Sequence, residues 1–327
     1  MIGEEKTTAG RAISGEGLLP LEACSDGIFR PGEAGVQEVL STRDGKVEFI
    51  VFAGRTLAYV KSALGYPAYY PVRPVRLARP VRAVLMDLDG TTVRSEGFWM
   101  AMIERTVADL RGDPGFRLTE TDHPFVAGHS VSEHLSYCLD RYCPGRTLEE
   151  ARARYFGHTR RELAAIAEGG GSHPAFAPAP GLADFLLALK ARQIKIALVT
   201  SGLWEKAWPE ILSAFRTIGL GDPRDFYDAI ISAGASPAPG QPGTLGELEP
   251  KPHPWLYAEA CRVGLGLPAD AADSVVGIED SSAGVCAIRL AGFPTIGLAG
   301  GNIEAAGVRS LCEHYCTSLD EVLAAIG

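Results

Sequence analysis

The stretch Ala83-Val-Leu-Met-Asp87-Leu-Asp-Gly-Thr91 decides the fold. Its first four residues are apolar, as is typical of a fully buried strand, and turn residues follow Asp87 directly. Asp87 and Asp89 flank one leucine on a turn that Gly90 opens, so both carboxylates can point into one site. One carboxylate can attack phosphorus as a nucleophile, and the other can protonate a leaving oxygen and then deprotonate water. An Asp-Gly turn with two solvated acids is the alternative interpretation.

Beyond residue 181, apolar strands alternate with helices. This pattern predicts an α/β fold with a parallel sheet that helices cover on both faces. Ligands of such sheets bind beyond the carboxyl ends of the strands. Asp87, Thr200 and Glu279–Asp280 each lie at such an end, so we expect them on one edge of the sheet. The expected strands are 83–87, 194–200, 229–232, 274–278 and 295–298, and the expected helices are 182–192, 203–218, 255–263, 282–291 and 319–326.

Two other regions precede this alternating part. Helical periodicity runs through 98–111, 130–142 and 148–167, and the block ends at a Gly-rich and Pro-rich segment, 168–181. In residues 1–80, the runs 47–53 and 56–60 predict a hairpin. Four prolines in 66–80 predict an extended linker instead of a regular element.

Thr200-Ser-Gly202 and Lys251 are the next candidates. A hydroxyl and backbone amides at a strand end, next to a helix N-terminus, suit a phosphate oxygen; an ordinary helix cap is the alternative. Lys251 lies in Glu249-Pro-Lys-Pro-His-Pro254, where alternating prolines fix the backbone. Its ammonium can offset charge on a nucleophile and a phosphoryl group, or it can simply face solvent.

The segment Gly277-Ile-Glu-Asp280-Ser-Ser-Ala-Gly284 is again a strand, a turn and a helix. Adjacent carboxylates at a strand end supply the oxygen ligands that Mg²⁺ prefers. A helix N-cap at Asp280 or Ser281, with Glu279 solvated, is the alternative.

Four segments resemble, in this order, the four motifs of the haloacid dehalogenase superfamily: Asp87–Thr91, Thr200, Lys251 and Glu279–Asp280. The resemblance covers about three quarters of the chain. Glu249–Tyr257 and Gly277–Gly292 look like its β-phosphoglucomutase-like and phosphatase branch. The resemblance implies a Rossmann-like parallel sheet core, 81–95 and 181–327, an inserted helical cap domain, 96–180, and a small N-terminal extension of unknown role, 1–80.

The resemblance also implies a role for each residue. Asp87 would be nucleophile and metal ligand, and Asp89 general acid and base with its carbonyl on Mg²⁺. Lys251 would stabilise charge. Asp280 would bind Mg²⁺, with Glu279 a direct or indirect ligand. The phosphate and substrate contacts would come from residues of the first and second motifs and of the cap: Thr91, Thr200, Ser201, Gly202, His129 and Ser130.

The other reactions of this superfamily fit less well. Dehalogenases lack the acid that stands here as Asp89, and phosphonate-cleaving relatives need a cap lysine, whereas no lysine occurs from 83 to 189. Gly128–Leu135 resembles the substrate-gripping loop of the mutases, but Val131 replaces an expected arginine. We therefore expect a phosphatase acting on a small phosphorylated metabolite. A sugar phosphate mutase is the main alternative, and a catalytically silent binding protein is the second.

The composition sets limits on the partners. The net charge of −9 disfavours nucleic acid, which needs a basic surface. No apolar run reaches the roughly 20 residues of a membrane helix, and the start, with Glu4, Glu5 and Lys6, predicts no secretory signal. Seven scattered cysteines predict reduced thiols and a cytoplasmic location. The sequence leaves the oligomeric state and the role of the long loop 234–247 open.

Overall fold

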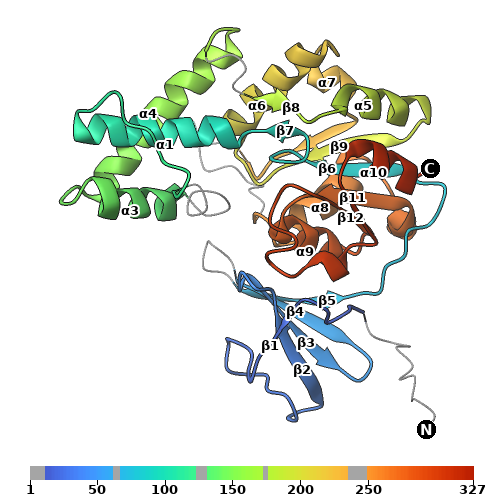
Figure 1. Cartoon of the computed structure of the whole chain (residues 1–327). Helices are drawn as coiled ribbons and strands as arrows, with labels where there is room; N and C mark the ends of the chain where they lie inside the picture. Colours follow the sequence, from blue (N-terminus) through green and yellow to red (C-terminus); the bar gives the residue numbers. More distant parts are fainter. Residues whose placement is uncertain (1–11, 62–66, 123–130, 172–175, 235–248) are drawn as a thin grey trace, which may run out of the picture.

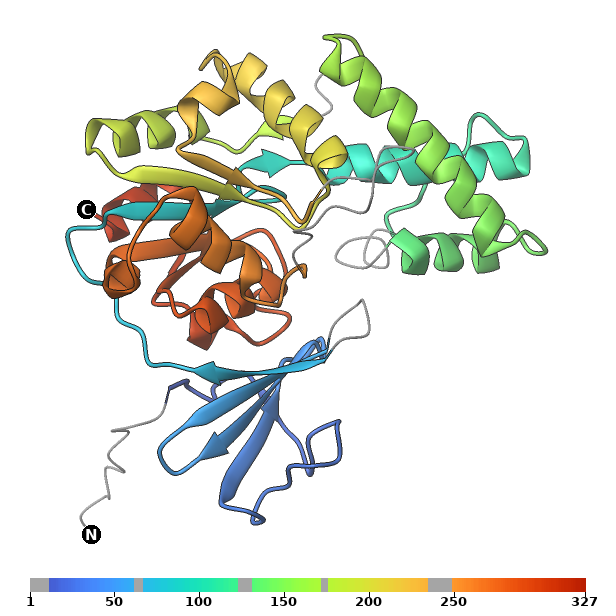
Figure 2. The same cartoon turned by 180° about the vertical axis from the view of Figure 1, so that it is seen from behind.

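The computed structural model describes residues 12–61, 67–122, 131–171, 176–234 and 249–327. Figure 1 and, from behind, Figure 2 show a parallel sheet between layers of helices, a separate antiparallel sheet below it, and a group of helices to one side.

Six strands form the parallel sheet, in the order β10-β9-β6-β11-β12-β13. Its central strand β6 is buried throughout, and Asp87 pairs with Val199 on one side while Met86 pairs with Ile278 on the other. The carboxyl ends of these strands are therefore level, and the predicted α/β fold is confirmed. The strands are β6 Ala83–Asp87, β9 Lys195–Val199, β10 Ala229–Ile231, β11 Val275–Glu279, β12 Thr295–Leu298 and β13 His314–Cys316.

Alternate side chains of β6 pack against opposite layers, as a two-residue period requires. Val84 and Met86 share a core with the layer of α5, α6 and α10, whereas Ala83 and Leu85 share one with α8 and α9. The helix expected at 255–263 is shorter, because a π-helical turn follows α8. The elements are α5 Leu182–Ala191, α6 Trp204–Ile218, α7 Pro223–Phe226, α8 Trp255–Glu259, the π turn Ala260–Gly264, α9 Ser282–Ala291 and α10 Leu319–Ala325, with 3-10 turns at Ala269–Ser274 and Arg309–Leu311.

Five antiparallel strands form a second sheet, which we call the N-terminal sheet. The hairpin of β3 and β4 is as predicted, but the linker at 66–80 is wrong in part, because Ala68–Val72 forms β5 and pairs with β4. Pro71 fits there since β5 is an edge strand, which needs no donor on its outer side. The strands are β1 Leu19–Pro20, β2 Val36–Ser41, β3 Val47–Phe52, β4 Thr56–Val60 and β5 Ala68–Val72.

The N-terminal sheet packs on the outer face of α9. Phe49 and Val60 of the sheet share one buried core with Val285 and Leu290 of the helix. The contact shows in both views as the antiparallel sheet lying directly below α9.

Three helices, which we call the helical layer, lie beyond the carboxyl edge of the parallel sheet: α1 Glu96–Arg111, α3 Val131–Tyr142 and α4 Leu148–Ala167. The chain enters this layer through β7 (Val93–Arg94) and returns through β8 (Ala177–Pro178). These two short strands pair with each other.

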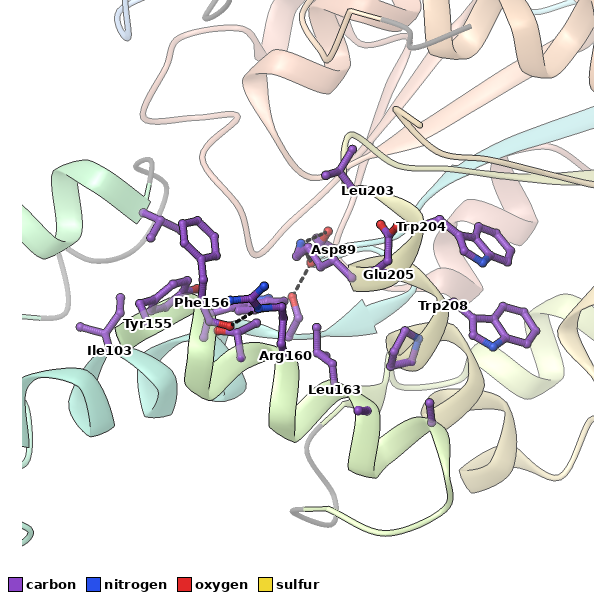
Figure 3. A pocket seen from close by; sticks show the side chains of 18 of the residues that line it. Asp89, Ile103, Tyr155, Phe156, Arg160, Leu163, Leu203, Trp204, Glu205 and Trp208 are labelled. Atoms are coloured by element: carbon purple, nitrogen blue, oxygen red, sulfur yellow. Dashed lines mark hydrogen bonds and ion pairs between the residues drawn. The ribbon is translucent and has the colours of Figure 1, made fainter. Parts of the chain in front are cut away.

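A cavity of about 1120 Å³ lies between the helical layer and α6. Figure 3 shows side chains from both sides entering it, with Asp89 among them. The fold thus places an open space next to the sheet edge where ligands are expected. None of the helices in the described parts of the chain has the length and apolar character needed to cross a bilayer.

Candidate active site

The turn after β6 brings Asp87 to the sheet edge and folds back at once. Thr92 donates its hydroxyl to the carbonyl of Asp87 and its amide to Leu88 O at 3.0 Å. Gly90 has φ +87°, and a Cβ atom there would lie 2.0 Å from Asp280 Oδ2. Glycine is therefore required twice at this position, for its backbone conformation and for the space that the Asp280 carboxylate takes.

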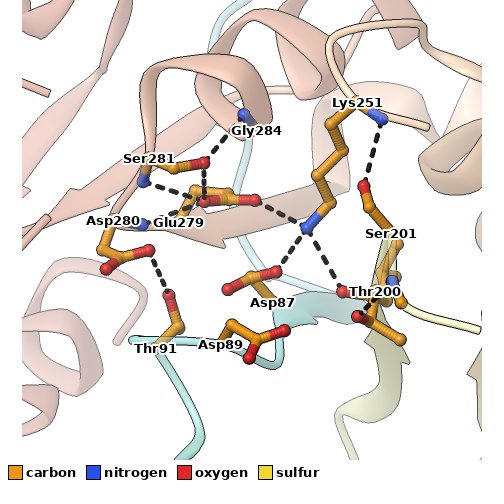
Figure 4. A network of polar contacts seen from close by, with 12 residues as sticks. Asp87, Asp89, Thr91, Thr200, Ser201, Lys251, Glu279, Asp280, Ser281 and Gly284 are labelled. Atoms are coloured by element: carbon orange, nitrogen blue, oxygen red, sulfur yellow. Dashed lines mark hydrogen bonds and ion pairs between the residues drawn. The ribbon is translucent and has the colours of Figure 1, made fainter. Parts of the chain in front are cut away.

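Lys251 connects the ends of three neighbouring strands. Its Nζ donates to Asp87 Oδ1, to Glu279 Oε1 at 2.7 Å and to Val199 O at 3.3 Å, as Figure 4 shows. Its backbone amide donates to Ser201 Oγ at 3.1 Å, which fixes the loop. The Lys251 side chain is 6% exposed. Although burial opposes the charged form, Asp87 and Glu279 hold the pKa of Lys251 above its ordinary value.

Glu279 is fully buried and accepts hydrogen bonds on both oxygens. Oε1 accepts from Lys251 and from the Tyr257 hydroxyl at 3.0 Å. Oε2 accepts from the amides of Asp280 and Ser281 at 3.1 and 3.0 Å, and from the Ser281 hydroxyl. Gly284 leaves room for this carboxylate, since a Cβ there would lie 1.6 Å from Oε1.

Three carboxylates meet at this edge: oxygens of Asp87, Glu279 and Asp280 lie within 4.8 Å of one another. Burial, and then the charge of Glu279, raise the pKa of Asp87 well above its ordinary value and that of Asp280 to about 8. Lys251 alone does not offset three negative charges. The donor set consists of carboxylate oxygens, which suit a hard divalent cation such as Mg²⁺, so the residues present fit such an ion.

Asp89 points away from this cluster toward α6. Its oxygens accept from Lys206 Nζ at 3.1 and 3.0 Å and from the Ser95 hydroxyl at 2.6 Å. Burial opposes ionisation, but Lys206 and Ser95 outweigh it and lower the pKa of Asp89. Lys206 also lies 3.6 Å from Glu210, a fully buried acid, and 4.7 Å from the ring centroid of Trp99 on α1.

Thr200, Ser201 and Gly202 follow β9, beside the loop of Lys251. Thr200 is buried, and its Oγ1 accepts from the Gly202 amide at 2.9 Å. Figure 4 places this turn across the Lys251 ammonium from Asp280. Thr91 is fully buried, and its hydroxyl donates to Asp280 Oδ1 at 3.5 Å.

The structure therefore gathers most of the residues singled out in the sequence. Asp87, Lys251, Glu279 and Asp280 are in one network, with Thr91 attached to it. Asp89 lies at its border, in contact with Lys206 instead. His129 and Ser130, like most of the loop 234–247, lie outside the described residues.

Sequence reasoning missed three side chains that hold this network: Ser95, Lys206 and Tyr257. A signal existed for Lys206, because it stands four residues before Glu210 on the helix after Thr200-Ser-Gly202. Such a spacing places both on one helical face. Tyr257 gave no comparable signal, since an aromatic residue at a helix start is most often part of the core.

Comparison with known proteins agrees with this geometry. Residues 81–292 match the model of a family described as "Hydrolase: haloacid dehalogenase-like hydrolase". A search of the curated proteins gave no match.

Solved structures share the fold. CbbY from Rhodobacter sphaeroides, in complex with phosphate, is 23% identical with a TM-score of 0.52, covering 75% of this chain and 99% of that one. A putative beta-phosphoglucomutase from Thermotoga maritima is 21% identical with a TM-score of 0.54, and the match covers 75% of this chain and 98% of that one. A predicted phosphoglycolate phosphatase from Haemophilus somnus 129PT is 16% identical (TM-score 0.57; 76% and 99% covered).

Proposed function

The chain belongs to the haloacid dehalogenase-like hydrolase family, and from this premise we propose that it is a magnesium-dependent phosphatase of a small phosphorylated metabolite. One observation supports this most: Asp87, Lys251 and Glu279, which are far apart in sequence, are in direct contact at the carboxyl edge of the sheet. Buried, oppositely charged groups in a preorganised cluster are what phosphoryl transfer requires.

In the first step, an Asp87 oxygen attacks phosphorus and the bond to the ester oxygen breaks. The Asp89 carboxyl group passes its proton to that oxygen, which leaves as an alcohol. Asp87 is then an aspartyl phosphate. The Lys251 ammonium, already in contact with Asp87, offsets the negative charge of the transferred group.

In the second step, water attacks the phosphorus and gives a proton to the Asp89 carboxylate. The bond to Asp87 breaks and inorganic phosphate leaves. Lys206 keeps the Asp89 carboxylate ionised, and the second step needs this ionised form as its base. When the phosphate dianion of a substrate lies next to Lys206, it weakens the interaction between Lys206 and Asp89. The pKa of Asp89 then rises, so that Asp89 carries the proton that the first step needs.

Mg²⁺ would be held by Asp87 and Asp280 and by the Asp89 carbonyl, and when bound it would offset negative charge at the phosphoryl group. Glu279 is the positioning group of this set, because both of its oxygens already accept hydrogen bonds from the protein. Thr91 orients Asp280.

Phosphate oxygens would lie against the turn of Thr200, Ser201 and Gly202, where a hydroxyl and amides face the Lys251 loop. The roles of His129 and Ser130 as substrate contacts stay a prediction. The helical layer would be the cap domain, residues 96–180. The core domain would then comprise residues 81–95 and 181–327, and residues 1–80 would be the N-terminal extension. Free thiols at all seven cysteines suit the cytoplasm.

Release of inorganic phosphate from a panel of phosphomonoesters in the presence of Mg²⁺ tests this function. Asp87→Asn removes the nucleophile and should lower kcat by at least about 10³-fold. Asp184→Asn, at an exposed position in the first turn of α5, is the matched control and should be without effect. Equal turnover by wild type and Asp87→Asn would refute the mechanism.

The same panel separates the alternatives. A mutase would convert one glucose phosphate into its isomer after priming with the bisphosphate and release little phosphate. A catalytically silent binding protein would bind esters without turnover, and Asp87→Asn would change nothing.

A further inference from the structure

The cavity between the helical layer and α6 is large for a phosphate group, at about 1120 Å³. Asp89 lines it, and under the proposed function Asp89 gives its proton to the leaving oxygen. The alcohol part of the substrate must therefore lie in this cavity. Its walls decide which alcohols bind well.

The described walls are mainly apolar. From the helical layer come Trp99, Ile103 and Phe156, and from the start of α6 come Leu203 and Trp204. Figure 3 shows Phe156 on the side of the helical layer and Leu203 on the other side, next to Asp89. Both are large apolar side chains that remain 40% and 42% exposed. A ligand that covers them recovers the hydrophobic free energy that their exposure costs.

Glu96, Thr159, Arg160 and Glu205 also line the cavity, but the two polar side chains that contact Asp89 are already in use. Ser95 and Lys206 both donate to Asp89. A sugar would bring several hydroxyl groups against Trp99, Ile103 and Phe156, and a hydroxyl buried without a partner is costly. An alkyl or arylalkyl chain has no such requirement.

We infer that the preferred substrates are phosphomonoesters of apolar alcohols, with an alkyl or arylalkyl chain seated between Phe156 and Leu203. The inference rests on the proposed function and narrows its substrate class.

A series of esters of primary alcohols tests it, because their leaving groups differ little in intrinsic reactivity. Ethyl, butyl, hexyl and 2-phenylethyl phosphate are compared with glycerol 3-phosphate and glucose 6-phosphate. We expect kcat/KM to rise roughly threefold for each added methylene and hexyl phosphate to exceed glucose 6-phosphate. Values that are independent of chain length, or a preference for glucose 6-phosphate, would overturn the inference and leave the phosphatase intact. No release from any ester would overturn both.

Two variants test whether the alkyl chain of the substrate lies between Phe156 and Leu203. Phe156→Ser and Leu203→Ser are tolerable because both side chains are partly exposed. Each should lower the ratio of kcat/KM for hexyl over ethyl phosphate by about tenfold. Leu187→Ser, 48% exposed on α5 and no part of the cavity wall, should keep the wild-type ratio. An unchanged ratio in both cavity variants would also overturn the inference.

A second, independent observation concerns the N-terminal sheet, which contacts both loops of the charge cluster. On β5, the Tyr70 hydroxyl forms a hydrogen bond of 2.6 Å with His253 Nδ1, two residues after Lys251. The rings of Tyr70 and Trp255 also form a T-shaped contact, with centroids 5.8 Å apart. The segment that carries Lys251 is thus held from the side of the N-terminal sheet.

The other contact comes from the turn between β2 and β3. Asp44 accepts a hydrogen bond from the Ser282 hydroxyl, and Ser282 is the first residue of α9, two after Asp280. Farther along α9, the buried Arg289 donates to Ala12 O at 3.0 Å and Arg73 O at 3.4 Å. The helix is therefore held at both its start and its end.

We propose that Tyr70 and Asp44 are positioning residues, through which the N-terminal sheet sets the places of Lys251 and Asp280. Like the first inference, this one takes the phosphatase reaction as given. Tyr70→Phe in the full-length enzyme removes one hydroxyl and should lower kcat about tenfold with KM within twofold. Tyr69→Phe is the matched control, because this exposed neighbour points to the other face of β5 and should keep the wild-type kcat.

A double variant separates positioning from a general loss of structure. If Tyr70 acts through His253, the pair Tyr70→Phe and His253→Gln lowers kcat no further than the stronger single variant does. Additive losses, or an unchanged kcat in Tyr70→Phe, would overturn the proposal. Each variant is compared with the turnover of the wild type. A wild type without turnover would contradict the phosphatase reaction itself, whereas the outcomes above concern only Tyr70 and His253.

Discussion

At the scale of single residues, the site is defined by an excess of negative charge. Asp87, Glu279 and Asp280 lie together in a buried place where Lys251 is the cation in direct contact with two of them. Protonation or a divalent cation has to compensate the rest. With the proposed Mg²⁺ site, the stability of the protein would depend on pH and on Mg²⁺.

Burial, and then the charge of Glu279, raise the pKa of Asp280 from 3.8 to about 8. The protonated form thus stabilises the fold fully below about pH 4, and this stabilisation is lost as pH rises to about 8. Mg²⁺ binds the ionised form, so its effect on Tm should be small at pH 5.5 and larger at pH 8. Thermal unfolding at both pH values, with and without MgCl₂, measures this difference.

The control for this prediction is Asp280→Asn. It carries no titratable group at this position, so Mg²⁺ should shift its Tm little at either pH. A Mg²⁺ shift that is the same at both pH values in the wild type would contradict the linkage.

Much of this residue-scale network could be predicted from the sequence, because Asp87, Thr200 and Glu279–Asp280 stand at the ends of apolar strands. The topology of a parallel sheet then brings them together. The direction of Asp89 could not be predicted, since it depends on Lys206 and Ser95, whose distances from it are set by how α6 and the turn pack.

At the scale of elements, two short segments shape the site: the turn after β6 and the first turn of α9. Both depend on glycines that leave space for a carboxylate, Gly90 for Asp280 and Gly284 for Glu279. A side chain at either glycine would displace an acid from the cluster.

Two effects of an alanine at position 90 can be distinguished by comparing Gly90→Ala with Gly112→Ala. One is the clash of its Cβ atom with Asp280, and the other is the cost of its left-handed backbone conformation. Gly112, the C-cap of α1, has φ +67°, and a Cβ atom there would meet nothing within 4 Å. Both variants should lose about 1–2 kcal/mol of stability from a left-handed alanine. Only Gly90→Ala should also lose about 100-fold in kcat, because Asp280 must move. Equal kcat in the two variants would show that Asp280 accommodates the methyl group.

Ser281 and Ser318 form a second matched pair. Both are N-caps, accepting from Gly284 N in α9 and from Glu321 N in α10. Each Ser→Ala change should lower the free energy of unfolding by about 1 kcal/mol. Ser281→Ala should in addition weaken activity or Mg²⁺ affinity about 10- to 100-fold, because its hydroxyl also orients Glu279. A Ser318→Ala variant with the same kinetic loss would contradict this assignment.

At this scale, strands whose side chains are buried along nearly their whole length were predicted well, and strands that are only partly buried were predicted poorly. The β6, β9 and β11 strands were found from their apolar runs. β5 was missed because Pro67 and Pro71 suggest a linker, and the pair of β7 and β8 because each has two residues. Edge position and long-range pairing stabilise these strands, and neither leaves a local pattern.

At the scale of the whole molecule, the N-terminal sheet and the family fold share a hydrophobic core. Phe49 and Val60 pack with Val285 and Leu290 of α9. The sequence of residues 1–80 predicted strands but not this docking, since the outer face of α9 is as apolar as any helix face in a core. Only the fold shows which segment covers it.

Phe49→Ala tests this shared core. The side chain is fully buried, so its loss should cost about 3–5 kcal/mol. All four tryptophans lie after residue 81, so their fluorescence reports the family fold, and Trp255 also senses the Tyr70 ring of β5. We expect the fluorescence midpoint to fall by at least about 5 °C. Leu187→Ala, at an exposed position, should leave it in place. A wild-type midpoint in Phe49→Ala would mean that the sheet unfolds independently.

The pairing of β7 with β8 has a consequence for the history of such proteins. The segment that carries the helical layer begins and ends at two backbone positions that this small ribbon holds together, Val93↔Pro178 and Arg94↔Ala177. Recombination at these points would exchange one insert for another without disturbing a single strand end of the parallel sheet. Such an exchange would replace the walls that α1 and α4 give to the cavity, and it would leave Asp87, Lys251, Glu279 and Asp280 in place.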